Sequence, residues 1–228
     1  MIKIYGKNLV IAAILNKAPL KEVFVLNTEH KLIKFLEENN LKYQFKTRQE
    51  LDNLFGKGHQ GIGALRENYK TYSLDFFFSA EENKRVLLLD GINDPQNFGA
   101  IIRSADAFGF KGIILGNNRS VPITPVVAHV STGAIEYVPI CYVNSLTNAI
   151  RLLKEHGYWI ISAEAFGRAR ISDIDLNRNI VLVIGSEGFG ISKTILKESD
   201  YIVSINMKGH VNSLNASVSA GILMEKLG

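Results

Sequence analysis

The sequence has little of what would indicate a secreted, membrane-bound or metal-dependent protein. Its 228 residues contain a single cysteine, Cys141, so no disulfide can form within the chain. The five histidines lack the spacing of metal ligands, and no apolar run approaches the roughly 18 residues that cross a bilayer. The segment from Met1 to Gly6 lacks the apolar core of a signal peptide. We therefore expect a cytoplasmic protein that holds no metal and contacts no membrane.

The charge balance also shows only a small excess of one sign. The formal net charge is +4 and the sequence pI is about 9.0, which is a mild indication of an anionic partner. Residues 1–85 hold 14 Lys and Arg against 10 Asp and Glu, whereas residues 86–228 hold 12 of each. An electropositive N-terminal domain would hold a polyanion near a neutral catalytic domain. Chance variation in surface charge is the alternative explanation.

The pattern of the first part predicts a small α/β domain over residues 1–66. The expected elements are a helix after Gly6, a strand at 22–26 and a helix at 30–39. Thr47-Arg-Gln-Glu50 has the form of a capping box, which predicts the start of another helix. Periodicity is lost and charge rises from 67 to 84, so this stretch is the predicted linker to a second domain at 85–228.

The second part lacks the glycine fingerprint of an ordinary dinucleotide-binding fold. Apolar strands alternate with helical segments there, which is typical of a parallel α/β domain; the strands are expected at 86–90, 111–115, 158–162, 180–184 and 201–205. No Gly-x-Gly-x-x-Gly follows the first of these strands, and the glycine-rich loop comes late, at 185–190. Cys141 lies in a β-like stretch with no base beside it, which favours a buried strand residue over a nucleophile.

The helix predicted after Pro95 has one apolar face and leaves Arg103 on the other. The apolar positions at helical spacing are Phe98, Ile101, Ile102, Ala105 and Phe108. Helical side chains lean toward the N-terminus, so Arg103 is expected to project over Gly99 toward Asn97 at the helix start. A guanidinium, an amide and a helix N-terminus together suit a phosphate. The alternative is structural: Arg103 pairs with Asp106, and Asn97 caps the helix.

Two further loops lie between a strand and a helix. The first, Gly185-Ser-Glu-Gly-Phe-Gly190, would let a ligand approach its backbone, and Glu187 could accept a hydrogen bond from an Arg or a ligand hydroxyl. Glycine needed only for a tight turn, with Ser192 capping the next helix, is the alternative. The second, Ser213-Leu-Asn215, opens the last helix, whose small residues predict close packing either in the core or against a second copy of the chain.

Taken in order, three segments resemble the motifs of the SpoU-type RNA ribose methyltransferases of the SPOUT superfamily. They are Asn97-x-Gly-x-x-x-Arg103, Gly185-x-Glu-Gly-x-Gly190 and Ser213-Leu-Asn-x-Ser217. The resemblance covers about residues 86–228. Through residues 4–10 and 59–64, the N-terminal part is similar to the ribosomal-protein-like RNA-binding domain of those members that methylate a guanosine in large-subunit (23S) ribosomal RNA.

This resemblance implies a fold, a cofactor and partners. The implied fold is a knotted (trefoil) parallel-sheet α/β methyltransferase domain preceded by a small α/β RNA-binding domain. The implied cofactor, S-adenosylmethionine, would contact backbone around Gly185, Ile205 and Leu214. The side chains or backbone that would shape its pocket are those of Glu187, Gly188, Ser213 and Asn215. The implied partners are RNA and a second copy of the chain, since family members are homodimers.

The resemblance also implies that Arg103, Asn97 and Asn215 are catalytic. Arg103 would lie at the ribose 2′-hydroxyl, held by Asn97 and by the phosphate of the target, with Asn215 and Ser213 completing the site. A ribose hydroxyl is a poor nucleophile, so the enzyme must position it and help to remove its proton. Because a guanidinium group normally stays protonated, orienting the phosphate and stabilising a developing alkoxide explain Arg103 as well as general base catalysis does.

Three other functions remain open at this point. Ribose methylation of transfer RNA is the first, because the catalytic motifs do not name the substrate. A non-catalytic RNA-binding assembly factor with the same fold is the second. A nicotinamide-dependent oxidoreductase is the third, and the missing fingerprint after the first strand argues against it.

Overall fold

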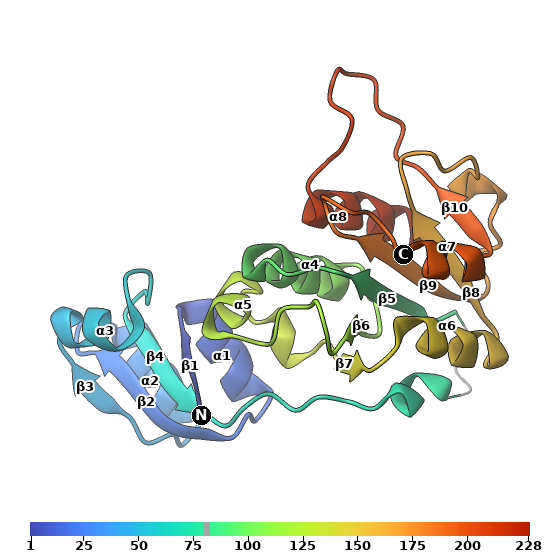
Figure 1. Cartoon of the computed structure of the whole chain (residues 1–228). Coiled ribbons are helices and arrows are strands. Elements are labelled where there is room, and N and C mark those ends of the chain that lie inside the picture. Colours follow the sequence, from blue (N-terminus) through green and yellow to red (C-terminus); the bar gives the residue numbers. More distant parts are fainter. Residues whose placement is uncertain (80–82) are drawn as a thin grey trace. The chain divides into compact units, whose positions relative to one another are not determined.

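The computed structural model describes residues 1–79 and 83–228, which form two compact units (Figure 1). Unit 1 contains Met1–Tyr69 and Ile123–Tyr137, and unit 2 contains Lys70–Pro122 and Val138–Gly228. Unit 1 therefore includes a segment from the middle of the chain that the sequence pattern had assigned to the second domain. The predicted linker at 67–84 includes residues 80–82, which lie outside the described residues.

Unit 1 is built around a four-stranded sheet with the order β1-β4-β2-β3. β4 is antiparallel to both β1 and β2, and β2 is parallel to β3. The strands are β1 (Ile2–Tyr5), β2 (Leu20–Leu26), β3 (Gln44–Lys46) and β4 (Ile62–Arg66). The helices are α1 (Lys7–Leu15), α2 (His30–Glu38), α3 (Arg48–Phe55), α5 (Pro125–Val130) and the 3-10 turn η2 (Ala134–Glu136). The predicted capping box is present at α3, where Thr47 accepts from Glu50 N and the Glu50 side chain accepts from Thr47 N.

The segment Ile123–Tyr137 is held in unit 1 by a buried ion pair. Arg66 pairs with Glu136, and their side chains are only 6% and 2% exposed. Glu136 also accepts a hydrogen bond from the Tyr69 hydroxyl at 2.9 Å, and the Arg66 guanidinium lies 3.7 Å from the centre of the Tyr69 ring. Burial, with the Glu136 charge adding to it, raises the pKa of Tyr69. Gly133 lets the backbone come close, since a Cβ there would lie 2.7 Å from the Cβ of Ala12.

Unit 2 contains a six-stranded, all-parallel sheet with the order β10-β8-β9-β5-β6-β7. The strands are β5 (Arg85–Asp90), β6 (Ile113–Gly116), β7 (Ile140–Val143), β8 (Tyr158–Ala163), β9 (Asn179–Gly185) and β10 (Tyr201–Val203). The helices are α4 (Pro95–Ala107), α6 (Leu146–Glu155), α7 (Lys193–Glu198) and α8 (Ala216–Leu227), with 3-10 turns η1 (Leu74–Phe78) and η3 (Ile171–Asp173).

The strand order sets the place of a ligand site. The chain adds β6 and β7 on one side of β5, and β9, β8 and β10 lie on the other, so the order reverses between β5 and β9. In a doubly wound fold of the usual order β8, not β9, would adjoin β5. Ligands of open parallel sheets bind outside the carboxyl ends of the strands at such a switch point. Here the loop after β5 and the glycine-rich turn after β9 meet at that edge.

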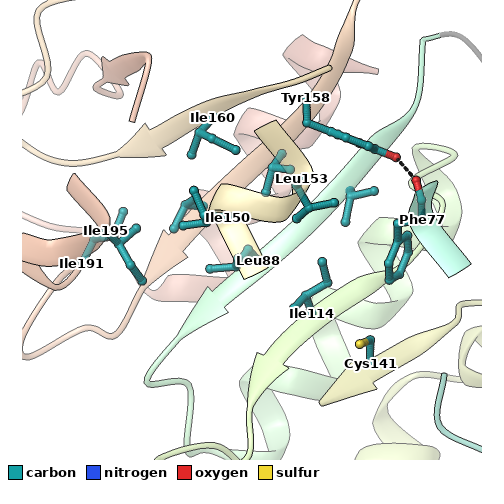
Figure 2. Close-up of a cluster of buried hydrophobic side chains, with 13 residues drawn as sticks. Phe77, Leu88, Ile114, Cys141, Ile150, Leu153, Tyr158, Ile160, Ile191 and Ile195 are labelled. Atoms are coloured by element: carbon teal, nitrogen blue, oxygen red, sulfur yellow. Dashed lines mark hydrogen bonds between the residues drawn. The ribbon is translucent and has the colours of Figure 1, made fainter. Parts of the chain in front are cut away.

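One face of this sheet carries a continuous apolar core (Figure 2). α6, α7 and η1 supply side chains to it, and Leu88, Ile114 and Ile160 come from the strands. Phe77 of η1 is buried in this core, where its carbonyl accepts a hydrogen bond from the Tyr158 hydroxyl at 2.8 Å. On the opposite face α8 packs against β9 and α4. The last helix therefore uses its small residues at least in part within its own chain.

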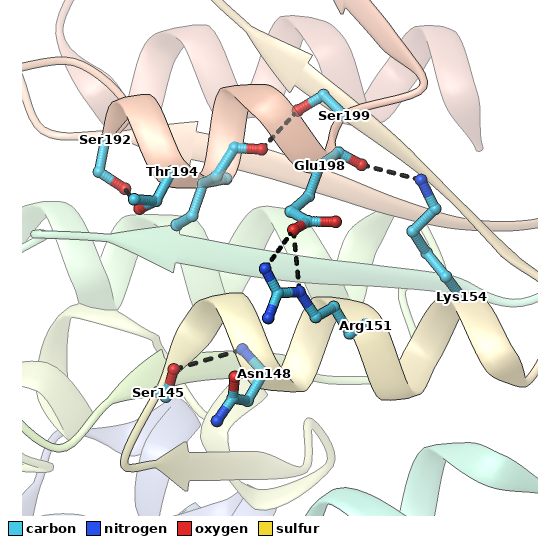
Figure 3. Close-up of polar contacts among 9 residues, drawn as sticks. Ser145, Asn148, Arg151, Lys154, Ser192, Thr194, Glu198 and Ser199 are labelled. Carbon is cyan, nitrogen blue, oxygen red and sulfur yellow. Dashed lines mark hydrogen bonds and ion pairs between the residues drawn. The ribbon is translucent and has the colours of Figure 1, made fainter.

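α6 and α7 are also joined by polar contacts on their outer side (Figure 3). Arg151 donates two hydrogen bonds, of 2.9 and 2.7 Å, to Glu198 Oε1, and Lys154 donates to the Glu198 carbonyl at 3.0 Å. Lys154 also pairs with Asp200 at 2.7 Å. These contacts fix the short α7, which directly follows the glycine-rich turn.

The structure corrects two details of the sequence pattern and confirms a third. The last predicted strand ends at Val203, not 205. Cys141 is a buried strand residue, as predicted, and its strand β7 is the sixth of the sheet. Burial raises the pKa of this thiol to about 11, with the charge of Asp75 adding to the shift. Phe108 is 36% exposed, because α4 ends at Ala107 and the helical spacing stops there. No helix in residues 1–79 and 83–228 is both long and apolar enough to cross a membrane.

Candidate active site

Three loops that are far apart in the sequence meet through one hydrogen-bonded cluster of side chains. Asn97 of α4 donates from Nδ2 to Glu187 Oε1 at 3.0 Å. Asn215, just before α8, donates from Nδ2 to Asn97 Oδ1 at 2.8 Å and to Glu187 Oε1 at 2.6 Å. The structure thus brings together one residue from each of the three predicted segments.

Asn97 is free for this contact because another residue caps α4. Asp94 is the N-cap and accepts from Asn97 N at 2.9 Å, and Pro95 follows at the first helical position, where proline is favoured. The alternative in which Asn97 caps its own helix is therefore wrong. Its amide, placed in the first turn, points its two polar atoms across to the other loops instead.

The Asn215 side chain both caps α8 and links it to the other two loops. Its Oδ1 accepts from Ser217 N at 2.9 Å and from Val218 N at 3.4 Å, which makes it the N-cap of α8. Its Nδ2 makes the two contacts to Asn97 and Glu187. Together these four polar contacts of one side chain fix the start of α8 relative to the other two loops.

Glu187 accepts three hydrogen bonds on a single oxygen. Besides the two asparagine amides, Ala216 N donates to Oε1 at 3.2 Å, and this N–H belongs to the first turn of α8. A carboxylate is stabilised at a helix N-terminus, where free N–H groups carry partial positive charge. Sequence reasoning expected an arginine or a ligand hydroxyl as the donor; within the described residues the donors are two amides and the backbone.

A cavity of about 390 Å³ opens beside this cluster, within unit 2. Five of the predicted cofactor residues line it: Gly185, Glu187, Ile205, Ser213 and Leu214. The other two, Gly188 and Asn215, lie in the same loops but are not among its walls. Sequence reasoning missed Glu164, Met207 and Asn212, which also line it. Glu164 follows β8 and is brought to the cavity only by the strand order, so no local pattern could have revealed it.

The glycines around the cavity are required by close backbone contacts. A Cβ on Gly185 would lie 2.3 Å from the carbonyl carbon of Gly190. Gly190 has φ +64°, and a Cβ there would lie 2.6 Å from Glu164 Oε1, which accepts a hydrogen bond from Ile191 N at 2.5 Å. Around Gly188, in contrast, the space is open. The turn is therefore narrow at its base and open at its tip.

The cavity fits S-adenosylmethionine in size and charge. Its volume lies within the range of small-molecule sites, roughly 300–1,000 Å³. Of the described residues that line it, two are acidic, Glu164 and Glu187, and none is basic. A cavity lined by acidic side chains and by no basic ones suits a ligand that carries a positively charged sulfonium.

Arg103 lies on the exposed side of α4, as its place in the helical pattern predicts. Across the described parts of the chain, no hydrogen bond or ion pair engages its guanidinium, so the alternative of an ion pair with Asp106 is not observed. Burial raises the pKa of Asp106. Arg103 is therefore available to an anion from outside the chain.

Comparisons with known proteins agree with this geometry. The family model described as SpoU rRNA Methylase family matches residues 84–225, and the model described as RNA 2′-O ribose methyltransferase substrate binding matches residues 3–72. A Staphylococcus haemolyticus protein, whose name places it in the TrmH family of tRNA/rRNA methyltransferases, is 38% identical over 98% of this chain and 93% of its own length.

Two crystal structures share the fold over almost the whole chain. The SpoU methyltransferase AviRb of Streptomyces viridochromogenes is 23% identical, with a TM-score of 0.86 over 99% of this chain and 88% of that one. An AdoMet-bound rRNA methyltransferase of Sinorhizobium meliloti is 22% identical, with a TM-score of 0.84 over 99% and 86%. The predicted α/β class, with a parallel sheet and an N-terminal substrate-binding domain, is confirmed, and the trefoil knot remains a prediction. The chain therefore belongs to the SpoU family of RNA methyltransferases in the SPOUT superfamily, whose cofactor is S-adenosylmethionine.

Proposed function

We propose that this RNA methyltransferase transfers the methyl group to the ribose 2′-hydroxyl of a guanosine in 23S ribosomal RNA. The observation that carries the proposal is the cluster of Asn97, Glu187 and Asn215 beside the cavity, with the unpaired Arg103 on the same helix as Asn97. The match of residues 3–72 to a ribose methyltransferase substrate-binding domain supports the 2′-hydroxyl as the acceptor.

The cofactor supplies a methyl group that is already activated by its attachment to a sulfonium. The residues that would hold it are Gly185, Glu187, Gly188, Ile205, Ser213, Leu214 and Asn215. The two glycines offer backbone without side-chain obstruction. Glu187 and Asn215 keep the turn and the start of α8 together, so that the cavity has its walls in place before the cofactor arrives.

Arg103 would act on the RNA side of the site. Its guanidinium has no partner among the described residues, and a planar fork of donors suits a phosphate oxygen pair. Holding the phosphate of the target nucleotide would orient the 2′-hydroxyl, and the positive charge would stabilise the alkoxide that develops as the proton leaves. We assign Asn97 and Asn215 to the same catalytic group, because both belong to the hydrogen-bonded cluster with Glu187 beside the cavity.

RNA binding by unit 1 is supported by a second cavity, of about 470 Å³. Three basic side chains line it, Lys7, Arg48 and Lys57, with two acidic ones, Glu29 and Asp52. Lys7 pairs with Glu29 at 2.9 Å. Basic groups at a concave surface attract the phosphates of RNA, and such binding weakens as salt rises. We further propose a cytoplasmic homodimer, on the family resemblance alone.

The test is methylation of defined RNAs. Protein and labelled S-adenosylmethionine are incubated with ribosomal RNA and, separately, with bulk transfer RNA, both from a strain lacking this gene, and the methylated nucleosides are identified by mass spectrometry. We expect 2′-O-methylguanosine in 23S RNA only. Label on a base instead of a ribose would refute the proposed acceptor.

Transfer RNA is the second candidate substrate, since the name of the S. haemolyticus relative covers both tRNA and rRNA. Label confined to the transfer RNA sample would establish it. A binding-only assembly factor predicts that the protein binds S-adenosylmethionine and RNA but labels neither sample. Assembled large ribosomal subunits are therefore included as a third substrate.

A further inference from the structure

Phe189 is an apolar side chain that the fold leaves almost completely uncovered. It is 97% exposed, more than any other large apolar side chain in the described part of the chain. It lies at the open tip of the glycine-rich turn 185–190, and it is one of the residues that line the cofactor cavity. A single exposed apolar side chain needs no partner by itself. This one lines the cavity to which the substrate must come, so its place in the site raises the question of what it contacts.

The exposure does not come from a loosely held loop. Gly190 N donates to the Ser186 carbonyl at 2.9 Å, and Phe189 N donates to Ser186 Oγ at 3.4 Å. Glu187 is bound to the asparagine cluster, and Ile191 N is bound to Glu164. Both ends of the turn are thus fixed, and the ring is presented on a held backbone.

The reaction determines what comes near this ring. For methyl transfer the acceptor oxygen must approach the methyl carbon to about 3–3.5 Å, so the target nucleotide has to reach the opening of the cofactor cavity. Sequence-specific recognition of RNA mostly uses unpaired nucleotides, and unpaired bases stack on aromatic side chains. Stacking on an aromatic side chain tolerates any RNA sequence, since every base has a flat aromatic face.

The exposed fraction separates Phe189 from the residues that would touch the cofactor. Leu214 and Ile205 are partly buried in the walls of the cavity and Val203 is fully buried, whereas Phe189 is covered over only a few per cent of its surface. Phe189 also lines the cavity, but its nearly uncovered ring leaves most of its surface free for a second molecule. Within residues 1–79 and 83–228, no other aromatic ring stacks on that of Phe189.

We propose that Phe189 is a substrate-binding residue that stacks on the base of the methylated nucleotide or of its direct neighbour in the RNA. The inference rests on the proposed function in one respect, that the acceptor is a nucleotide brought to this cavity. It adds a base contact to a site whose other RNA contact, Arg103, is with phosphate.

The experiment compares Phe189→Ala and Phe189→Trp with wild type in the full-length protein. RNA affinity is measured by filter binding with S-adenosylhomocysteine present, so that it does not depend on turnover, and KM for RNA is measured by methylation of whichever RNA the wild type modifies. Phe166→Ala is the matched control, because Phe166 is also an exposed phenylalanine of unit 2, at 63%. Cofactor affinity is measured by calorimetry and molecular mass by light scattering.

We expect Phe189→Ala to weaken RNA binding and raise KM by about 5- to 150-fold, the range that corresponds to stacking of one base. Phe189→Trp and Phe166→Ala should stay within twofold of wild type, and cofactor affinity should not change. Since stacking releases no counterions, Phe189→Ala should weaken RNA binding by the same factor at 50 and at 200 mM salt.

Three results would overturn the inference. RNA affinity within twofold of wild type in Phe189→Ala would show that the ring binds no base. An equal loss of cofactor affinity would mean that the ring covers the adenine, and a change in mass would mean that a second copy covers it. If the wild type methylates no ribose, the proposed function fails, and the filter-binding comparison on 23S RNA still decides whether Phe189 contacts RNA.

Discussion

Replacing Asn215 by aspartate separates its two roles. Asn215→Asp keeps an oxygen that can accept from Ser217 N and Val218 N, so the cap of α8 is retained. It replaces the amide nitrogen, which lies 2.6 Å from Glu187 Oε1 and 2.8 Å from Asn97 Oδ1, by an oxygen that can donate to neither at neutral pH. The change therefore breaks the hydrogen bonds between loops and leaves the helix intact.

The size of the effect follows from the two hydrogen bonds that the substitution removes. A hydrogen bond to a charged group contributes about 1.5–3 kcal/mol and a neutral one about 1 kcal/mol. Repulsion between the new carboxylate and Glu187 adds about 1 kcal/mol, because both groups are exposed and water screens them. The walls of the cavity should thus be destabilised by about 3–5 kcal/mol, which predicts a cofactor dissociation constant at least about 100-fold above wild type.

The assay is calorimetric titration with S-adenosylmethionine between pH 5 and pH 8, with Asn215→Ser as the control. Serine also caps a helix and also lacks the amide, but it adds no charge. Repulsion raises the pKa of the introduced carboxylate above its value in the unfolded chain. The free-energy cost of the repulsion is therefore present at pH 7, and it shrinks as the carboxylate takes up a proton toward about pH 5. Asn215→Asp within threefold of wild type at pH 7.5, or the same pH dependence for both variants, would refute the reasoning.

Three further predictions concern single side chains. Arg103→Ala should reduce methyl transfer in single-turnover assays by at least about 100-fold while cofactor affinity by calorimetry changes less than threefold, because the guanidinium faces the RNA; wild-type turnover would contradict its assignment. Glu136→Ala should destabilise unit 1 by about 3–5 kcal/mol in urea unfolding, because Arg66 is left as a buried, unpaired charge. Glu38→Ala, which removes an exposed partner of an ion pair at 3.9 Å, should cost under about 0.5 kcal/mol, and equal losses in the two variants would argue against the burial effect. Cys141 should resist iodoacetamide at pH 8 in the native protein and react after denaturation, since it is buried and its pKa is raised to about 11; rapid native labelling, followed by mass spectrometry, would show otherwise.

The local part of the fold could be read from the sequence. The capping box at Thr47, the apolar face of α4 and the strands of the parallel sheet follow from short-range rules, and they lie where these rules put them, to within a few residues. Asp94 before Pro95 satisfies the same rules better than Asn97 does, so the true cap of α4 was readable as well.

The contacts between distant segments could not be read in this way. The bonds of Glu187 to Asn97 and Asn215 join residues 90 and 28 positions apart, and they depend on β9 lying next to β5. Nothing in the period of the hydrophobic pattern distinguishes this strand order from the usual one. Only the family resemblance placed the three loops in one site. It predicted which residues lie there, but not the hydrogen bonds between them.

The place of the segment Ile123–Tyr137 has a consequence for how such a protein can be cut or recombined. A catalytic half made by removing residues 1–69 would keep this segment, but α5 would lose its contacts with β1, η2 those with α1, and Glu136 its partner Arg66. A protein engineer who moves unit 1 with all its contacts cannot cut at one junction, because the segment Ile123–Tyr137 belongs to it. Moving unit 1 to another methyltransferase would require both Met1–Tyr69 and the fifteen-residue segment Ile123–Tyr137. That segment would then replace the corresponding residues between β6 and β7 of the recipient.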